Sequence, residues 1–182
     1  DSALSGRVVS GGSTITMQTA RMLEPRDRNV GSKLIEIVRA HQIERRLTKD
    51  EILALYLTLT PYGGNLEGVR AASWSYFGHE ADRLSDDEIA LLIALPQSPE
   101  ARRPDRRPEN AARARDWVAQ KLANYGVFSE DDVADVAASG VPGRRRDFPD
   151  RAWHGTAKAL ASGPRGDVRT TLDSGLQAEV ER

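Results

Sequence analysis

The stretch "TKDEILALYLTL", residues 48–59, decides the fold. It opens with Thr-x-x-Glu, the pattern of a capping box, in which a hydroxyl and a glutamate satisfy the free backbone N–H groups at the start of a helix. The same device recurs in "SDDE", residues 85–88, before the apolar run "IALLIALPQ", where Pro96 is expected to end the helix. Repeated helix starts of this kind predict a mainly α-helical protein.

Further helices are expected on both sides of this stretch. Between residues 31 and 47, apolar side chains recur at helical spacing and predict an amphipathic helix that buries one stripe, made of Leu34, Ile35, Ile37, Val38, Ile43 and Leu47, beside a charged face with Lys33, Glu36, Arg39 and Arg46. Residues 65–78 are expected to form a helix closed by Gly78, and another helix is expected from Pro108 to Gly126. A short helix is predicted within residues 129–139, and only residues 167–173 suggest a strand, followed by a helix.

Composition excludes several classes of protein. The chain has 182 residues, a formal net charge of −1 and no apolar run long enough to cross a membrane. Cysteine is absent, which excludes thiolate chemistry and disulfides, and His41, His79 and His154 lie too far apart to suggest a zinc site. The opening "DSALSGRVVS" looks cut rather than started, so a missing signal or anchor says nothing about location.

Two arginine runs are candidate binding patches for nucleic acid or lipid headgroups. They are "RRPDRR", residues 102–107, and "RRR", residues 144–146. Aspartates interleave with the arginines, the net charge is near zero, and no nucleic-acid-binding motif accompanies them. Solvated loops are therefore expected, with no nucleic-acid partner.

The stretch "GGSTITMQTARML", residues 11–23, allows two interpretations. Hydroxyls at Ser13, Thr14 and Thr16 can cap the following helix. Alternatively, these hydroxyls, exposed N–H groups and Gln18 form a cradle for an oxyanion such as a phosphate. The Gly-Lys-Ser/Thr ending of a P-loop is missing, so a nucleotide-binding P-loop is not predicted.

The order of the motifs adds a resemblance. "GGSTITMQTARML", then "SKLIEIVRAHQIERRLTKDEILALYLTLTPYGGNLEGVRAASWSYFG", then "LSDDEIALLIALPQSP" closely resembles the family-51 glycosyltransferase domain of class A penicillin-binding proteins, most like the 1C branch. The resemblance covers residues 10–108. It implies a lysozyme-like α-helical fold at the outer, periplasmic face of the bacterial cytoplasmic membrane, and polymerisation of lipid II into glycan strands with inversion and release of undecaprenyl pyrophosphate.

The resemblance also implies site residues. "SKLIE", residues 32–36, matches the family pattern Arg-Lys-x-x-Glu, so Lys33 is expected to neutralise the diphosphate. Glu36 is expected to orient Lys33 or the diphosphate, or to hold a divalent cation such as Mg²⁺ or Mn²⁺; no motif requires a cofactor. Ser32 departs from the pattern, and Arg39 is a candidate to compensate for the lost arginine.

Other matched positions are assigned to the groove or to the scaffold. Ser13, Thr14 and Gln18 match positions that line the donor side of the groove and the diphosphate region. Tyr62 and Gly63 are expected to shape the groove, Tyr56 to pack in the core, and "RAASWSYFG" and "ALPQSP" to be scaffold.

The chain is expected to hold only part of the enzyme. The family's general base, a glutamate in a Glu-Asp-x-x-Phe motif, has no counterpart in residues 1–10, so the isolated chain is expected to be weak or inactive. The predicted organisation is a partial glycosyltransferase domain in residues 1–126, a short helix and linker in 127–166, and the start of a segment leading to a transpeptidase in 167–182. Two alternatives remain open: a noncatalytic module that binds a lipid diphosphate, and a lysozyme-like hydrolase, which would need a placed general acid.

Overall fold

The computed structural model describes residues 13–27, 29–148 and residue 161. The chain separates into two compact units, residues 1–146 and 147–182, and the helices described below lie in the first. The strand and helix predicted for residues 167–182 lie outside the described residues, and the predicted division at residue 126 stays a prediction.

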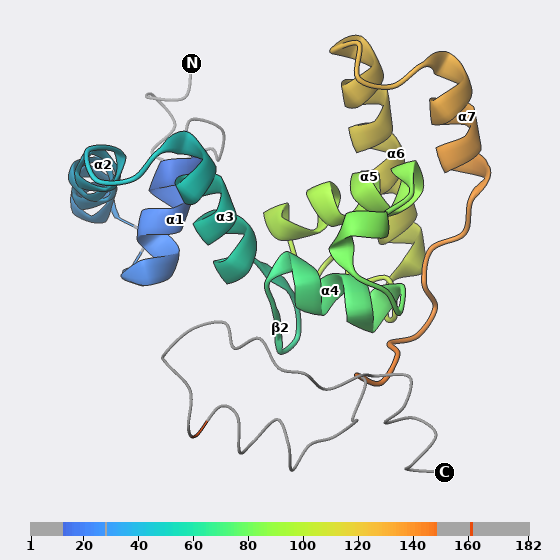
Figure 1. Ribbon diagram of the computed structural model, residues 1–182, viewed down its shortest axis with the longest axis horizontal. Helices are drawn as coiled ribbons and strands as arrows, with labels where there is room; N and C mark the ends of the chain where they lie inside the picture. Colours follow the sequence, from blue (N-terminus) through green and yellow to red (C-terminus); the bar gives the residue numbers. More distant parts are fainter. Residues whose placement is uncertain (1–12, 28, 149–160, 162–182) are drawn as a thin grey trace. The chain divides into compact units, whose positions relative to one another are not determined.

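The described residues are mainly helical, which confirms the predicted class (Figure 1). Their elements in chain order are α1 (Ile15–Leu23), α2 (Val30–Glu44), α3 (Lys49–Leu59), β1 (Pro61–Gly63), β2 (Leu66–Glu67), α4 (Val69–Tyr76), the 3₁₀ turn η1 (Ala81–Arg83), α5 (Asp86–Ala94), the 3₁₀ turn η2 (Leu95–Gln97), α6 (Pro108–Asn124) and α7 (Glu130–Ala138). The described part contains no helix with the length and hydropathy needed to cross a bilayer.

The helix ends follow the local sequence. Thr48 and Glu51 form the predicted capping box at the start of α3, with a distance of 2.8 Å between the Thr48 nitrogen and Glu51 Oε2, and Ser85 and Glu88 form another before α5. Helix α5 ends at Ala94, and the chain passes through Pro96 in a 3₁₀ turn. Gly78 follows α4 with a φ of 86°, a left-handed conformation that glycine adopts without strain. The predicted starts and stops of these helices are confirmed.

The core has two neighbouring clusters of apolar side chains. One joins the hairpin, α4, α5 and α6 and consists of Tyr62, Leu66, Ala72, Tyr76, Leu91, Leu92, Leu95 and Ala111. The other joins α5, α6 and α7 and consists of Ala90, Ala94, Val118, Ala119 and Val136. Two sides of α5 are therefore covered, which explains most of its apolar run, although Ile93 stays exposed.

The short antiparallel hairpin β1–β2 was not predicted. It places Tyr62 in the core, where the Tyr76 hydroxyl donates to the Tyr62 carbonyl oxygen at 2.9 Å. Tyr62 is thus a core residue rather than a side chain that shapes a groove, and Tyr56 is half-buried. Strands of two or three residues are too short to show a period in the sequence, which is why periodicity did not reveal them.

The amphipathic helix α2 is present, but the prediction of which face is buried was wrong. The predicted buried stripe includes Leu34, Ile37 and Val38, which are exposed, whereas Ala40 is buried. The side of α2 that meets α1 carries Lys33, Glu36, Ala40 and Glu44, spaced as neighbours on one helix face. The helical spacing of apolar residues identified the apolar side of α2 correctly. It does not show which side of the helix another element covers.

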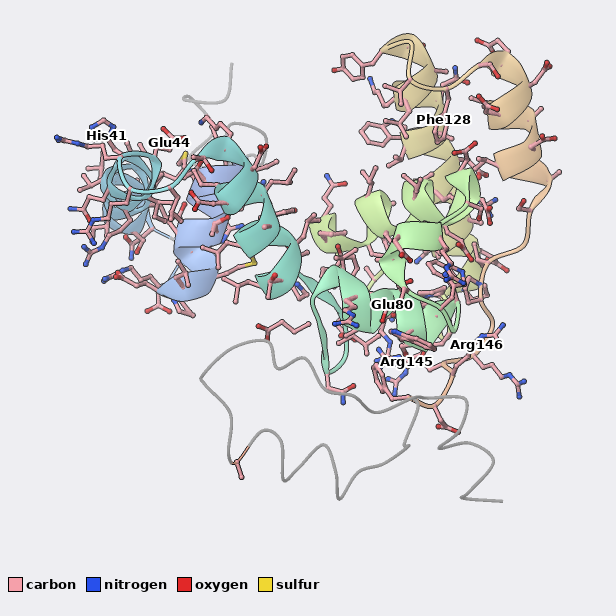
Figure 2. The ribbon with its side chains drawn as sticks, in the orientation of Figure 1. His41, Glu44, Glu80, Phe128, Arg145 and Arg146 are labelled. Atoms are coloured by element: carbon pink, nitrogen blue, oxygen red, sulfur yellow. The ribbon has the colours of Figure 1, made fainter. Side chains whose placement is uncertain are left out.

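The prediction that the arginine runs are solvated loops was also wrong for two of their members. Arg103 is buried, and its NH2 atom lies 2.6 Å from Asp105 Oδ2. Arg145 donates to the Gly63 carbonyl oxygen at 2.6 Å and to Asn65 Oδ1 at 3.0 Å, and Asp105 lies 3.6 Å from its Nε atom. Arg145 thus fastens the chain after α7 to the hairpin (Figure 2).

Gly63 makes this close approach possible. Its φ is 104°, and a Cβ atom there would lie 2.6 Å from Cγ of Arg103. A side chain at residue 63 would therefore strain the backbone and displace the buried arginine.

Candidate functional site

The candidate site lies where α1 meets α2. Thr14 is the N-cap of α1, and its hydroxyl accepts a hydrogen bond from the Met17 N–H at 3.2 Å. Asn29 caps α2 in the same way, through the Ser32 N–H at 2.8 Å. The two caps fix the starts of both helices, and Ser13, Gln18, Lys33 and Glu36 lie near these starts.

Lys33, Glu36 and Ser13 meet as one cluster. The Lys33 ammonium group donates to the Ser13 hydroxyl, and its Nζ atom lies 3.3 Å from Glu36 Oε2. The Glu36 side chain is only 12% exposed, whereas that of Lys33 is 35% exposed. The carboxylate thus lies deeper than the ammonium group, which remains accessible to a ligand.

Arg21 completes the cluster and was not predicted from the sequence. Its NH1 atom lies 4.0 Å from Glu36 Oε1, whereas Lys33 lies near the other carboxylate oxygen, Oε2. The available signal was its position in the last turn of α1, three residues after Gln18 and seven after Thr14, which places it on the same helix face. The cluster has two cations around one carboxylate and therefore a net positive charge.

The other predicted site residues do not join these contacts in the described structure. The Thr14 hydroxyl is engaged in capping, so the capping interpretation holds for this residue. Gln18 is half-buried on α1, and no side-chain hydrogen bond to the cluster is formed within the described residues. Arg39 instead donates to Glu24 Oε2 at 3.2 Å and to Gln42 Oε1 at 2.9 Å.

A second, partly buried contact supports the α1–α2 interface. The Thr16 hydroxyl donates to Glu44 Oε1 at 2.8 Å, and the Lys49 ammonium group lies 3.0 Å from the same oxygen. The hydrogen bond from Thr16, followed by Lys49, holds the pKa of Glu44 below its usual value. Thr16 therefore fixes the helix pair rather than capping α1.

The donor set does not fit a divalent cation held by the protein. Mg²⁺ prefers several oxygen ligands, and carboxylates supply them best. Within the described residues, no three His, Asp or Glu side chains gather around one point, and Glu36 already lies between two cations. Two cations and a hydroxyl instead suit an anionic oxygen group such as a phosphate.

Comparisons with known proteins identify the family of this chain. The family model described as Transglycosylase matches residues 1–123, so the chain belongs to the transglycosylase family. Penicillin-binding protein 1C from Escherichia coli is 44% identical over 177 residues, which is 97% of this chain and 23% of that protein. Penicillin-binding protein 1A from Pseudomonas aeruginosa is 37% identical over 127 residues, covering 69% of this chain and 16% of that protein.

A solved structure was also matched, penicillin-binding protein 1A from Haemophilus influenzae, with a TM-score of 0.48 and 19% identity over 80% of this chain and 19% of that one. The resemblance to penicillin-binding proteins stated from the motifs is confirmed by the sequence matches. The chain spans less than a quarter of the length of these relatives.

Proposed function

We propose that this chain forms part of a peptidoglycan glycosyltransferase that polymerises lipid II into glycan strands at the outer face of the bacterial cytoplasmic membrane. In this reaction a sugar hydroxyl of the acceptor attacks the anomeric carbon of the donor. The bond from that carbon to the diphosphate breaks, and a carboxylate base takes the proton. Membership of the transglycosylase family supports the reaction class.

The single observation that carries the proposal is the Ser13–Lys33–Glu36 cluster. The leaving diphosphate gains negative charge as its bond to the sugar breaks, and a positioned cation stabilises that charge best. Lys33 is held by Ser13 and Glu36 yet remains partly exposed, so it is preorganised for this role. Arg21 supplies a second cation, and Glu36 fixes both.

The remaining site residues take supporting roles in the proposal. Gln18 is assigned to the donor side of the groove, and Thr14 caps the start of α1, directly after Ser13. Arg39, which pairs with Glu24, contributes positive charge near the diphosphate without direct contact with the cluster. The general base is assigned to the upstream glutamate of the family motif.

Polymerisation of fluorescent lipid II tests this proposal in the protein encoded by the complete reading frame. Lys33→Gln should lower the rate by about 10²- to 10³-fold, the usual loss on removing one preorganised charge-stabilising donor. Lys49→Gln is the matched control, because Lys49 is exposed and pairs with Glu44 outside the cluster. Glu36→Gln should also reduce the rate, since the two cations lose the carboxylate that positions them.

Each outcome has a distinct meaning. Equal loss in Lys33→Gln and Lys49→Gln, or no loss in Lys33→Gln, would contradict the assigned role. Binding of undecaprenyl pyrophosphate without polymerisation, in folded protein, would favour the noncatalytic module. Release of monosaccharides or disaccharides from finished glycan would favour the hydrolase.

A further inference from the structure

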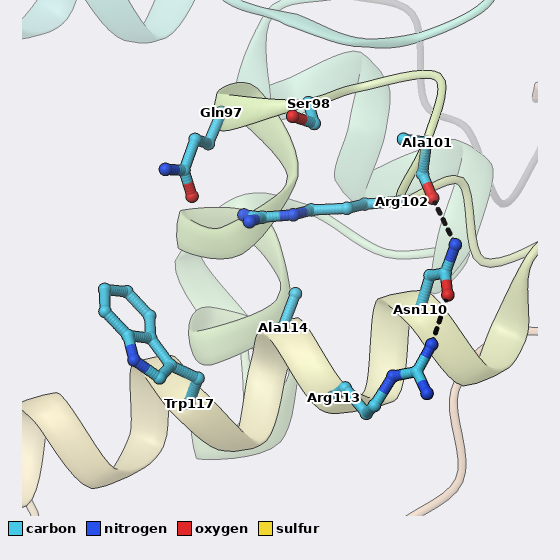
Figure 3. Close-up of a pocket in the computed structure, with 8 residues that line it drawn as sticks. All are labelled: Gln97, Ser98, Ala101, Arg102, Asn110, Arg113, Ala114 and Trp117. Carbon is cyan, nitrogen blue, oxygen red and sulfur yellow. Dashed lines mark hydrogen bonds between the residues drawn. The ribbon is translucent and has the colours of Figure 1, made fainter. Parts of the chain in front are cut away.

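A pocket of about 550 Å³ lies between the segment that follows α5 and helix α6 (Figure 3). Pockets of this size bind ligands in many proteins. One wall is formed by residues 97–102, and the other by the face of α6 that carries Asn110, Arg113 and Trp117. None of the residues that line this pocket has a role in the function proposed above.

The pocket carries positive charge at two separate places. Arg102 and Arg113 both line it, and among the described residues no aspartate or glutamate does. The guanidinium end of Arg102 lies at the end of the pocket where Gln97 and Trp117 are (Figure 3). That of Arg113 lies at the opposite end, beside Asn110. A ligand that pairs with both arginines must therefore carry two negative groups separated along its length.

Both arginines are held in place by neutral acceptors. Arg102 NH1 donates to the Ala94 carbonyl oxygen at 2.7 Å, and Arg113 NH2 donates to Asn110 Oδ1 at 2.6 Å. Within the described part of the chain, neither arginine forms an ion pair. A guanidinium group has five N–H donors, so each arginine keeps donors for a ligand. A fixed cation without a counterion favours a partner that brings a carboxylate.

Apolar side chains are exposed beside these charges. Trp117 is 58% exposed, which is unusual for the largest aromatic side chain, and Ile93, four residues before Gln97, is 54% exposed. Lys121 Nζ lies 5.4 Å from the centroid of the Trp117 ring and adds a third cation. Trp and Arg are enriched among the residues that dominate the binding energy of protein–protein interfaces. The surface around the pocket thus has the composition of a protein-binding site.

We propose that this pocket docks an acidic segment of a partner protein, in which an apolar or aromatic side chain is flanked by two carboxylates. The apolar side chain packs on Trp117, and the carboxylates pair with Arg102 and Arg113 at the two ends. Gln97 and Ser98 supply amide and hydroxyl groups for hydrogen bonds to the backbone of the segment. Charge complementarity carries this choice of partner: the whole chain has a net charge of −1, yet the charged residues that line the pocket are all positive.

Nucleic acids and anionic membranes match this surface less well. Both present many negative groups at short intervals and bind best to a continuous basic surface. Here aspartates lie close to the pocket in sequence: Asp105 pairs with Arg103, and Asp116, next to Trp117, pairs with Arg115. These carboxylates repel a dense polyanion, whereas a protein segment places its few carboxylates only where the cations are.

Selection from a phage library of random linear peptides, on the complete protein, tests the proposal. Peptides retained by the unaltered protein and lost on the double variant Arg102→Gln/Arg113→Gln should carry acidic residues on both sides of a Leu, Phe or Trp. A synthetic peptide with the selected sequence is then labelled, and its affinity is measured by fluorescence anisotropy. No enrichment, or enrichment of neutral peptides only, would overturn the proposal.

Single variants locate the contacts. Arg102→Gln and Arg113→Gln should each weaken binding of the selected peptide at least about tenfold, since each removes a charged hydrogen bond. Trp117→Ala should weaken it at least about 30-fold, the usual loss at a dominant aromatic contact. Arg113 and Trp117 are exposed, so their substitution leaves the fold intact, and unchanged binding in both variants would contradict the proposal. Arg46→Gln removes a charge from an exposed position after α2 and, as the matched control, should bind like the unaltered protein.

The separation of the two arginines allows a sharper test. Replacing one acidic residue of the peptide by its amide should cancel the loss caused by Arg102→Gln, but not the loss caused by Arg113→Gln. Replacing the other acidic residue should do the reverse. If both arginine variants couple to the same acidic residue, the arrangement with one carboxylate at each end is wrong.

Two anionic probes of other classes complete the experiment, oligo-dT and vesicles that contain phosphatidylglycerol. Neither should bind with a dependence on Trp117 and Arg113. Binding of either probe that is lost in Trp117→Ala and Arg113→Gln, together with a failure to select acidic peptides, would reject a protein partner for this pocket.

Discussion

Asp105 is the residue on which the arginines around the hairpin depend. Its carboxylate contacts Arg103, whose side chain is 8% exposed, and Arg145, whose side chain is 23% exposed. The hydrogen bonds from Arg103 hold the pKa of Asp105 below its usual value, and the charge of Arg145 acts in the same direction. Asp105 is therefore the shared counterion of two partly or fully buried cations.

Asp105→Ala should strongly destabilise the protein, because it leaves Arg103 buried without its main counterion. The expected loss is about 3 kcal/mol in the free energy of unfolding, measured with urea at pH 7. Asp82→Ala is the matched control: Asp82 is exposed and lies 4.0 Å from Arg83, so its effect should stay within about 0.5 kcal/mol.

The pH dependence follows from the lowered pKa of Asp105. Its stabilising contribution is present above the pKa of the unfolded chain, near 3.9, and is lost as the pH falls through the lower folded value. The difference in stability between the natural protein and Asp105→Ala should therefore shrink below about pH 4. A difference that stays constant down to pH 2.5 would contradict this assignment of the charge.

The contribution of His79 to the free energy of unfolding should have the opposite dependence on pH. The hydrogen bond to the Glu80 carbonyl oxygen, at 2.9 Å, raises the pKa of His79, and Glu88, 3.2 Å from Nε2, adds to the shift. A raised pKa stabilises the fold below the unfolded value near 6.5, and that contribution is lost as the pH rises through the folded value. His79→Gln should narrow the difference in unfolding free energy between pH 5.5 and pH 8.5, measured with urea; an unchanged difference would reject the role of His79.

At the scale of elements, Arg115 connects α6 to the end of α7. It is 2% exposed, and its NH1 atom donates to the carbonyl oxygens of Ser139 at 2.8 Å and Gly140 at 3.2 Å. The last carbonyl groups of a helix have no partner within the helix, so a cation at this end is favourable. Helix α7, which also contributes Val136 to the core, is held at its C-terminal end by this residue.

Arg115→Gln should loosen α7 more than the rest of the described unit. We expect faster amide hydrogen exchange in residues 130–138 and a loss of about 1–3 kcal/mol in unfolding free energy, because a buried donor that serves two carbonyl groups is removed. Gln120→Ala, on the exposed side of α6, is the control and should leave exchange in α7 unchanged. Uniform acceleration across α1 to α7 would show that Arg115 supports the whole unit instead.

Element boundaries could be predicted because their causes are local. The capping boxes at Thr48 and Ser85, the stop at Pro96 and the left-handed Gly78 act through neighbouring residues, and the structure has each where expected. The β1–β2 hairpin could not be predicted in this way, since Tyr62 and Gly63 owe their conformation to Arg103 and Arg145, which are distant in sequence. Helix α2 shows the same limit, because packing against α1 determines which face of α2 is buried.

At the scale of the whole molecule, the motifs identified the family but gave only part of the candidate site. Lys33 and Glu36 were found because the family pattern keeps them three residues apart in one helix, and Ser13 because it matched a family position. Arg21 was missed because it reaches Glu36 only when α1 packs against α2. The pocket lined by Gln97, Arg102 and Trp117 was missed because its side chains come from two separate segments, residues 97–102 and 110–117, to which no chemical role was assigned.

Helix α2 has a charged side that is covered and an apolar side that is exposed. Helix α2 turns its charged side toward α1, and Leu34, Val38 and Val30 remain exposed. Large apolar residues exposed together mark surfaces that other molecules or chain segments cover.

The hydrogen bonds that Arg145 makes with Gly63 and Asn65 of the hairpin also predict the order of events in folding. Its hydrogen bonds join positions 80 and 82 residues apart, whereas the helix pairs α1–α2 and α6–α7 join neighbours in the chain. Contacts between residues distant in sequence require a larger loss of chain entropy. The Arg145 hydrogen bonds are therefore expected to form after the folding transition state. Arg145→Gln should then speed unfolding about tenfold and leave the refolding rate unchanged in stopped-flow measurements, unlike Arg144→Gln at the exposed neighbouring position. The segment after α7 would thus affect how long the folded state survives, rather than how fast it is reached.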